Sequence, residues 1–130
     1  MSKMEECKIH VSVGELFDKY SILEIKLIKI KDVHKLKLVF KELKLLEPQI
    51  QKYKLDSEIY DKLKIINTKL WNIEDKIRIK ESLQEFDNEF IQLARDVYFS
   101  NDVRASIKKN INMIFKSEII EVKEYVNYKN

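Results

Sequence analysis

The chain has few of the residues on which several common folds and sites depend. Its 130 residues include one glycine, one proline and one cysteine. Tight β-hairpin turns rely on glycine and proline, so the composition argues against a hairpin-rich β fold. The lone Gly14 cannot build the glycine-rich phosphate loops of nucleotide-binding proteins. The single Cys7 allows no internal disulfide, which fits a reducing cytoplasm.

Long uncharged apolar runs and a recognisable secretion signal are also missing. Charged residues make up 36% of the chain and hydrophobic residues 45%, so the sequence is too apolar for a disordered chain. No stretch is apolar enough for a membrane span, and the N-terminus has no apolar core followed by a cleavage site. We therefore expect one helical domain over residues 1–130, in the cytoplasm and without a membrane partner.

Charge is distributed unevenly along the chain. The net charge of +3 is only mildly basic and does not by itself indicate a nucleic-acid partner. Residues 26–54 carry a balance of +6, whereas residues 70–104 carry −3. A lysine-rich segment is usually a solvated helix face, because lysine covers apolar surface with its stem and keeps its charge in water. A surface that binds polyanions is the alternative interpretation.

Apolar residues recur at helical spacing through most of the chain and predict an all-α bundle. The five predicted helices extend over about residues 13–30, 32–53, 57–83, 87–98 and 101–114, with a break at Ser100 or Asn101 before the last. Residues that can cap helix starts precede these stretches: Ser12 in an S-x-x-E capping box, Asp32, Asp56 or Ser57, and Asp87. The second and third helices are expected to form a long antiparallel hairpin that turns at residues 54–57.

Both ends of the chain have short alternating segments. Residues 7–13 alternate and are rich in β-branched side chains, and residues 118–130 alternate in part. These segments predict a two-strand ribbon that joins the termini. The first helix also carries a second apolar strip, made of Ile22, Ile25 and Ile28, which predicts that it packs on two sides.

Several charged residues lie close to the apolar stripes of the predicted helices. Glu24, Glu74 and Glu81 fall within about 70° of a stripe centre at 100° per residue. Arg78 lies between the last two, and Trp71 precedes them on the same side. Charges at a core boundary cost free energy unless they are paired. The group is therefore either a structural ion-pair network or a ligand pocket.

A second polar group surrounds the predicted start of the last helix. It contains Arg95, Tyr98, Asn101, Asp102 and Arg104. Arginine makes bidentate contacts with carboxylates and phosphates that lysine cannot reproduce, and a helix N-terminus adds backbone donors for an anion. Helix capping beside surface arginines is the alternative interpretation.

Glu15 and Asp18 form an E-x-x-D pair one helical turn apart. Together with carboxylates on a later helix, such a pair could hold Mg²⁺, as in all-α nucleotide pyrophosphatases. The candidate partners Glu74, Glu81, Glu85 and Glu89 all lack a carboxylate three residues on, so this metal site is a minor hypothesis.

Four segments resemble an uncharacterised family of short bacterial and phage proteins, a domain of unknown function. They are residues 11–26 (VSVGELFDKYSILEIK), 70–81 (LWNIEDKIRIKE), 90–112 (FIQLARDVYFSNDVRASIKKNIN) and 117–125 (SEIIEVKEY). Bacterial members of that family often lie near surface-polysaccharide and glycosyltransferase genes. The resemblance implies a shared site formed by the ends of the chain, with the lysine-rich middle as variable scaffold.

The resemblance marks a set of polar positions and one departure. The matching positions are Glu15, Asp18, Lys19, Glu24, Lys26, Glu74, Asp75, Arg78, Glu81, Arg95, Tyr98, Asn101, Asp102, Arg104 and Lys108. Members of the family often have glycine before the closing segment, where this chain has Lys116.

Three functional hypotheses follow, and the sequence does not decide whether the protein is an enzyme. The first is a pocket for a small anionic ligand: a phosphorylated sugar, a nucleotide or a nucleotide-sugar. The expected ligand-binding residues are Glu24, Trp71, Glu74, Arg78, Glu81, Arg95, Tyr98, Asn101, Asp102 and Arg104. The second is a non-enzymatic homodimeric module with the isoleucine strip as its interface. The third is a Mg²⁺-dependent nucleotide pyrophosphatase-like hydrolase that uses Glu15 and Asp18; no other cofactor is expected.

Overall fold

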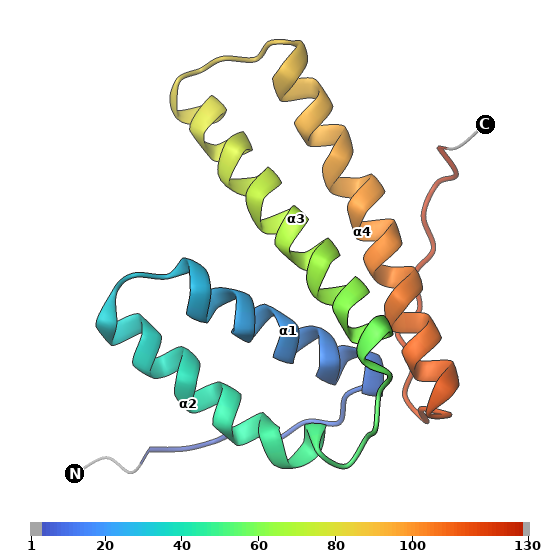
Figure 1. Cartoon of the computed structure of the whole chain (residues 1–130). Helices are drawn as coiled ribbons and strands as arrows, with labels where there is room; N and C mark the ends of the chain where they lie inside the picture. The colour runs from blue at the N-terminus through green and yellow to red at the C-terminus, as the bar shows by residue number, and fades with distance from the viewer. Residues whose placement is uncertain (1–3, 129–130) are drawn as a thin grey trace.

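Four α-helices make up most of the computed structural model, which describes residues 4–128 (Figure 1). The shorter pair is α1 (Val13–Lys29) and α2 (Val33–Ile50), and the longer pair is α3 (Ser57–Ser82) and α4 (Asn88–Ile114). The predicted all-α class is confirmed. Within the described part of the chain, no helix has the length and apolar character needed to cross a lipid bilayer.

The helices begin at the predicted capping residues. The side chains of Ser12, Asp32, Asp56 and Asp87 each accept a hydrogen bond from a backbone N–H in the first turn of the helix that follows. Each such cap contributes about 1 kcal/mol, because it satisfies a donor that has no partner within the helix.

The helices pair as two hairpins, α1 with α2 and α3 with α4. Figure 1 shows α1 between α2 and the longer hairpin, and α1 packs against all three other helices. The predicted hairpin of the second and third helices is therefore wrong. The apolar stripe of α2 instead packs on α1, where Val39 and Leu43 form a buried cluster with Leu23.

The fourth and fifth predicted helices are one continuous helix, so the expected break at Ser100 or Asn101 is wrong. Ser100 is 2% exposed in the middle of α4, and Asp102 accepts a hydrogen bond from Tyr128. Burial of one long helix face outweighs the weak preference of serine and asparagine for helix ends.

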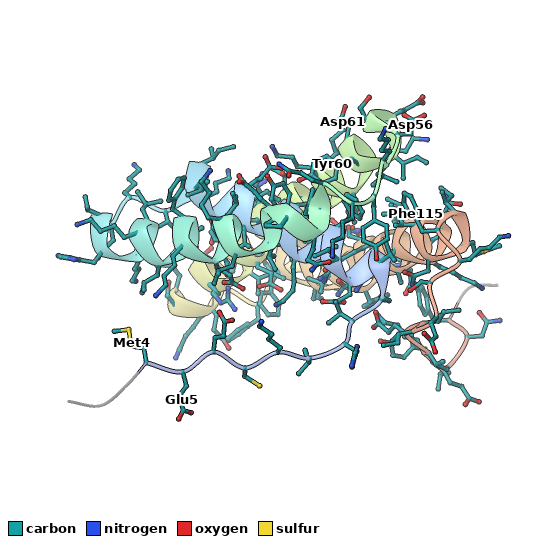
Figure 2. All side chains as sticks on the ribbon, turned by 90° about the horizontal axis from the view of Figure 1, so that it is seen from below. Met4, Glu5, Asp56, Tyr60, Asp61 and Phe115 are labelled. Atoms are coloured by element: carbon teal, nitrogen blue, oxygen red, sulfur yellow. The ribbon has the colours of Figure 1, made fainter. Side chains whose placement is uncertain are left out.

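The predicted ribbon between the termini is not confirmed. No residue from 4 to 128 is in a β-strand, and residues 129 and 130 lie outside the described part. The N-terminal segment runs along the outside of the helices, and Met4 and Glu5 project from opposite sides of it, with Glu5 directed away from the helices (Figure 2). The two ends do meet at one point, where the backbone N–H of Val13 donates to Ser117 Oγ at 3.1 Å.

The largest apolar cluster lies where α1, α3 and α4 meet. Its buried members are Val13, Phe17, Leu63, Ile66 and Ile111.

The second isoleucine strip of α1 is split between core and solvent. Ile25 is 3% exposed and Ile28 is 72% exposed. Because Ile25 is already buried within one chain, it cannot contribute the dimer contact that the sequence suggested.

The scarcity of glycine has a visible consequence at two helix ends. Gln84 and Lys116, which follow the C-caps of α3 and α4, adopt positive φ angles of 54° and 50°. In both places the next backbone N–H bonds back to a carbonyl five residues earlier, Glu85 to Lys80 at 3.0 Å and Ser117 to Asn112 at 2.8 Å. This is the geometry that glycine favours after a helix. Of these two residues, Lys116 occupies the position at which members of the resembling family often have glycine.

Candidate functional site

A buried aspartate on α1 is the centre of the polar network in the molecule. Asp18 is 0% exposed. Its carboxylate accepts two hydrogen bonds from Arg104 of α4, one from Nε at 2.9 Å and one from Nη2. It also accepts a bond from Asn67 Nδ2 of α3 at 2.9 Å. Asp18 therefore joins three helices through one side chain.

Two further polar side chains complete the surroundings of this carboxylate. Asn67 Nδ2 also donates to Ser21 Oγ at 2.8 Å, and Ser21 Oγ donates to the backbone carbonyl of Asp18 at 2.8 Å. Within residues 4–128, no buried side-chain nitrogen or oxygen lacks a hydrogen-bond partner. Full satisfaction matters because an unpaired polar group in an apolar interior costs about 1–3 kcal/mol.

Lys108 lies one turn after Arg104 and is surrounded by three carboxylates. Its Nζ donates to Glu15 Oε2 at 2.7 Å and to Glu121 Oε2 at 3.0 Å, and it lies 3.8 Å from Asp18 Oδ2. The side chain is 8% exposed. The E-x-x-D pair of α1 thus faces an R-x-x-x-K pair of α4.

The charged groups of the network hold each other in their ionised forms. Burial alone would raise the pKa of the Asp18 carboxyl, but hydrogen bonds from Arg104 and Asn67 and the charge of Lys108 lower it below the ordinary value. Burial would lower the pKa of Lys108, whereas its bonds to Glu15 and Glu121 raise it overall. Asp18 and Lys108 therefore both carry their charge at neutral pH.

Gly14 allows α1 and α4 to approach closely enough to form this network. A Cβ atom at Gly14 would lie 2.5 Å from the backbone oxygen of Lys108, which is far below a normal contact. Its backbone N–H donates to Asn112 Oδ1 at 2.6 Å. The one glycine in the sequence therefore sits where a side chain cannot fit, and the need is steric rather than conformational.

A groove of about 330 Å³ opens beside the network. It is lined by Glu15, Asp18, Lys19, Ile22, Leu23, Lys26, Glu42 and Arg104. The Arg104 side chain is 29% exposed there, and its Nη1 atom donates to no residue of the described chain. Lys19 and Lys26 likewise make no ion pair with any residue from 4 to 128. The groove is therefore lined by three cationic side chains with donors to spare, together with the carboxylates of Glu15, Asp18 and Glu42.

The structure separates the arginine-rich group that the sequence placed together. Of its members, Arg104 lines the groove. Asp102 accepts a hydrogen bond from the Tyr128 hydroxyl, whose pKa is raised to about 12 by that bond, and the Tyr98 ring lies 5.0 Å from the Tyr128 ring. Arg95 is exposed and lies 5.8 Å from the ring of Phe99. Asn101 is half-buried within α4.

The predicted glutamate group is dispersed along α3 and α1. Glu74 and Arg78 form an exposed i,i+4 ion pair at 3.3 Å, and Glu81 is exposed. Trp71 is half-buried.

Glu24 has a structural role on α1, away from the groove lining. It accepts a hydrogen bond from Tyr60 and lies 3.8 Å from Lys64. Burial and this bond to Glu24 both raise the pKa of Tyr60. For these residues the interpretation as ion pairs describes the geometry better than a shared pocket does.

The structure adds residues that the sequence did not single out, among them Asn67 and Glu121. Asn67 lies between Leu63 and Leu70 at helical spacing, so a polar residue inside the apolar stripe of α3 was the available signal. Glu121 belongs to an extended segment whose position follows from tertiary contacts alone.

The carboxylates proposed for Mg²⁺ face cations. Glu15 is bonded to Lys108, and Asp18 to Arg104, so two side chains already supply the positive charge that a metal ion would bring. No cluster of three or more potential metal ligands exists among residues 4–128.

Comparison with known proteins identifies a family for the chain. No curated protein and no solved structure matches the chain. A family model matches residues 7–129, which include all four helices and the closing segment that carries Glu121. The chain therefore belongs to DUF6165, a family of unknown function.

Proposed function

We propose that the protein binds a small anionic ligand in the groove beside Arg104. The candidates are a phosphorylated sugar, a nucleotide or a nucleotide-sugar, with a phosphate group as the shared feature. One observation carries the proposal: Arg104 lines the groove, is held in place by the buried Asp18 through Nε and Nη2, and donates no hydrogen bond from Nη1 within the described chain. A guanidinium that is oriented in advance binds an anion at a smaller entropic cost.

The charges and size of the groove support this choice. Lys19 and Lys26 lie on the same helix two turns apart and flank the groove, and they have no acidic partner in the described structure. The volume of about 330 Å³ is at the lower end of the roughly 300–1,000 Å³ of typical ligand sites. It suits a phosphate with one sugar ring better than a complete nucleotide-sugar.

Two acidic side chains make the groove selective for sugar-containing anions over highly charged ones. Glu15 and Glu42 can accept hydrogen bonds from sugar hydroxyls and would repel a highly charged polyanion. Among the candidates we favour a sugar-linked phosphate. The link between the resembling family and polysaccharide genes also favours a sugar-linked phosphate. A cytoplasmic location is part of the proposal, and the exposed free thiol of Cys7 is compatible with it.

Thermal unfolding in the presence of four probes tests the proposal. The probes are inorganic phosphate, glucose 6-phosphate, UMP and UDP-glucose. A ligand at a hundred times its Kd stabilises the folded state by about 2.7 kcal/mol, which is a readily measured rise in Tm. We expect glucose 6-phosphate to raise Tm more than inorganic phosphate, UMP or UDP-glucose does, because the groove suits a phosphate with one sugar ring.

A matched pair of double variants separates a site from general electrostatics. Lys19→Ala with Lys26→Ala removes two groove cations, whereas Lys35→Ala with Lys37→Ala removes two exposed lysines of α2 outside the groove. Both pairs change the net charge equally. The proposal predicts that only the first pair abolishes the rise in Tm. It is wrong if no probe raises Tm, or if both pairs weaken the effect equally.

A further inference from the structure

Two surface patches with exposed apolar side chains and opposite net charge lie on different hairpins. The tip patch is residues 79–91, which form the end of α3, the connecting loop and the start of α4. The α2 patch is residues 33–45. Each patch has four large hydrophobic side chains that are more than half exposed. Exposed apolar groups gathered in this way indicate an interaction surface.

The tip patch is acidic. Its exposed hydrophobic residues are Ile79 at 59%, Leu83 at 60%, Phe86 at 58% and Ile91 at 53%. Four carboxylates and one lysine give residues 79–91 a net charge of −3. Lys80 bonds three of those carboxylates, with Nζ–O distances of 2.8–3.3 Å. One lysine shared by three acids leaves the surface negative.

The tip extends beyond the rest of the fold. The residues between Ile73 of α3 and Leu93 of α4 include none that is buried. Figure 1 shows the end of the α3–α4 hairpin projecting past α1. Within residues 4–128, Ile79, Leu83, Phe86 and Ile91 are left more than half exposed there.

The α2 patch is basic. Its exposed hydrophobic residues are Val33 at 62%, Leu38 at 69%, Phe40 at 52% and Leu45 at 56%. The net charge of residues 33–45 is +3 with histidine neutral.

The lysines of the α2 patch lie along the helix face that points away from α1. At 100° per residue, Lys37, Lys41 and Lys44 fall within about 60° of each other, opposite the stripe of Val39 and Leu43 that packs on α1. This places a row of positive charge between two lines of apolar side chains.

The two patches cannot meet within one molecule. Among the described residues α2 packs on α1 alone, and α1 separates it from the α3–α4 hairpin (Figure 1). The complementary surfaces are therefore available only to a different molecule.

We propose that the tip patch of one copy docks on the α2 patch of a second copy of this chain. The apolar side chains supply the buried core of the contact, and the charges of −3 and +3 orient it and oppose tip-to-tip or α2-to-α2 pairing. Two such contacts related by a two-fold axis close a dimer. This self-association does not rest on the anion-binding groove, which shares only Glu42 with the α2 patch.

Sedimentation velocity of the full chain tests the proposal from micromolar to near-millimolar concentration, at low and high salt. We expect self-association that weakens as salt increases, because exposed charges are screened. Glu81→Lys with Glu85→Lys should weaken it about tenfold or more, and so should Lys37→Glu with Lys41→Glu. Lys80 keeps Asp87 and Glu89 in the first variant, and circular dichroism checks that both variants fold.

The decisive step is charge exchange. A chain that carries all four substitutions has patches of +1 and −1, which are complementary again, and it should recover self-association that both double variants lose. Mixing the two double variants should also restore complexes. As a control, Glu5→Lys with Glu118→Lys changes the charge by the same amount at exposed sites elsewhere and should have no effect. A chain that is monomeric throughout, or a four-substitution chain that does not recover, overturns the proposal.

Discussion

Replacement of Asp18 by asparagine should destabilise the protein strongly, because the carboxylate is the hub of a buried network. It accepts two bonds from Arg104 and one from Asn67 and lies 3.8 Å from Lys108. Asparagine retains the shape but removes the charge. Arg104 and Lys108 then lose a negative partner, while their side chains are only 29% and 8% exposed.

The expected loss is about 3 kcal/mol of the free energy of unfolding. Removing one partner of a buried ion pair typically costs about 3–5 kcal/mol, since the remaining charge stays desolvated. The lower end applies here because Lys108 keeps Glu15 and Glu121 as partners, and Arg104 has some access to water.

Urea unfolding at neutral pH, followed by circular dichroism, measures this loss. Asp75→Asn is the matched control, since Asp75 is exposed on α3 and its change should stay within about 0.5 kcal/mol. A double-mutant cycle with Arg104→Met should give a coupling of about 1–3 kcal/mol, with the double variant less destabilised than the sum of the single ones. An Asp18→Asn protein as stable as the control, or additive losses in the cycle, would refute the reasoning.

Four other perturbations test separate parts of the structure. The stability that Asp18 contributes is present above its ordinary pKa of 3.8 and is lost as pH falls toward the lower folded-state pKa. The free energy of unfolding measured in urea should therefore decrease below about pH 4. It should decrease less steeply in the Asp18→Asn protein. Gly14→Ala places a Cβ atom 2.5 Å from a backbone oxygen of α4 and should cost about 3 kcal/mol, so an unchanged Tm contradicts the close approach. Lys116→Gly relieves a positive φ and should gain about 1 kcal/mol, which a lower Tm would disprove. Tyr60→Phe leaves Glu24 with one partner fewer and should cost about 1–3 kcal/mol; a neutral result in urea would show that this bond is unimportant.

Local features of the fold could be predicted because they depend on neighbouring residues. The caps at Ser12 and Asp87 and the end of α3 near Leu83 follow from residue type and apolar spacing. The helix pairing could not be predicted in this way. The stripe of α2 is equally suited to α1 or α3, and only three-dimensional packing selects α1. The continuity of α4 through Ser100 also depends on tertiary packing. The burial of Ser100 outweighs the weak preference of serine for helix ends.

The candidate site was predictable only in part. Arg104 was recognised as a residue able to make bidentate contacts, and that role is directed at Asp18. The sequence placed Glu15 and Asp18 as a metal pair because spacing shows that two carboxylates are neighbours but not which charge faces them. That information is carried by Arg104 and Lys108, roughly ninety residues later and on another helix.

Titration of the ¹⁵N-labelled protein with glucose 6-phosphate, followed by amide chemical shifts, tests the central proposal most directly. We predict saturable shifts at Lys19, Lys26 and Arg104, which line the groove, and unchanged shifts at the tip around Phe86. Loss of these shifts in the Lys19→Ala and Lys26→Ala double variant would locate the binding in the groove. Shifts that never saturate, or that spread equally over the lysines of α2, would contradict an anion-binding site at Arg104.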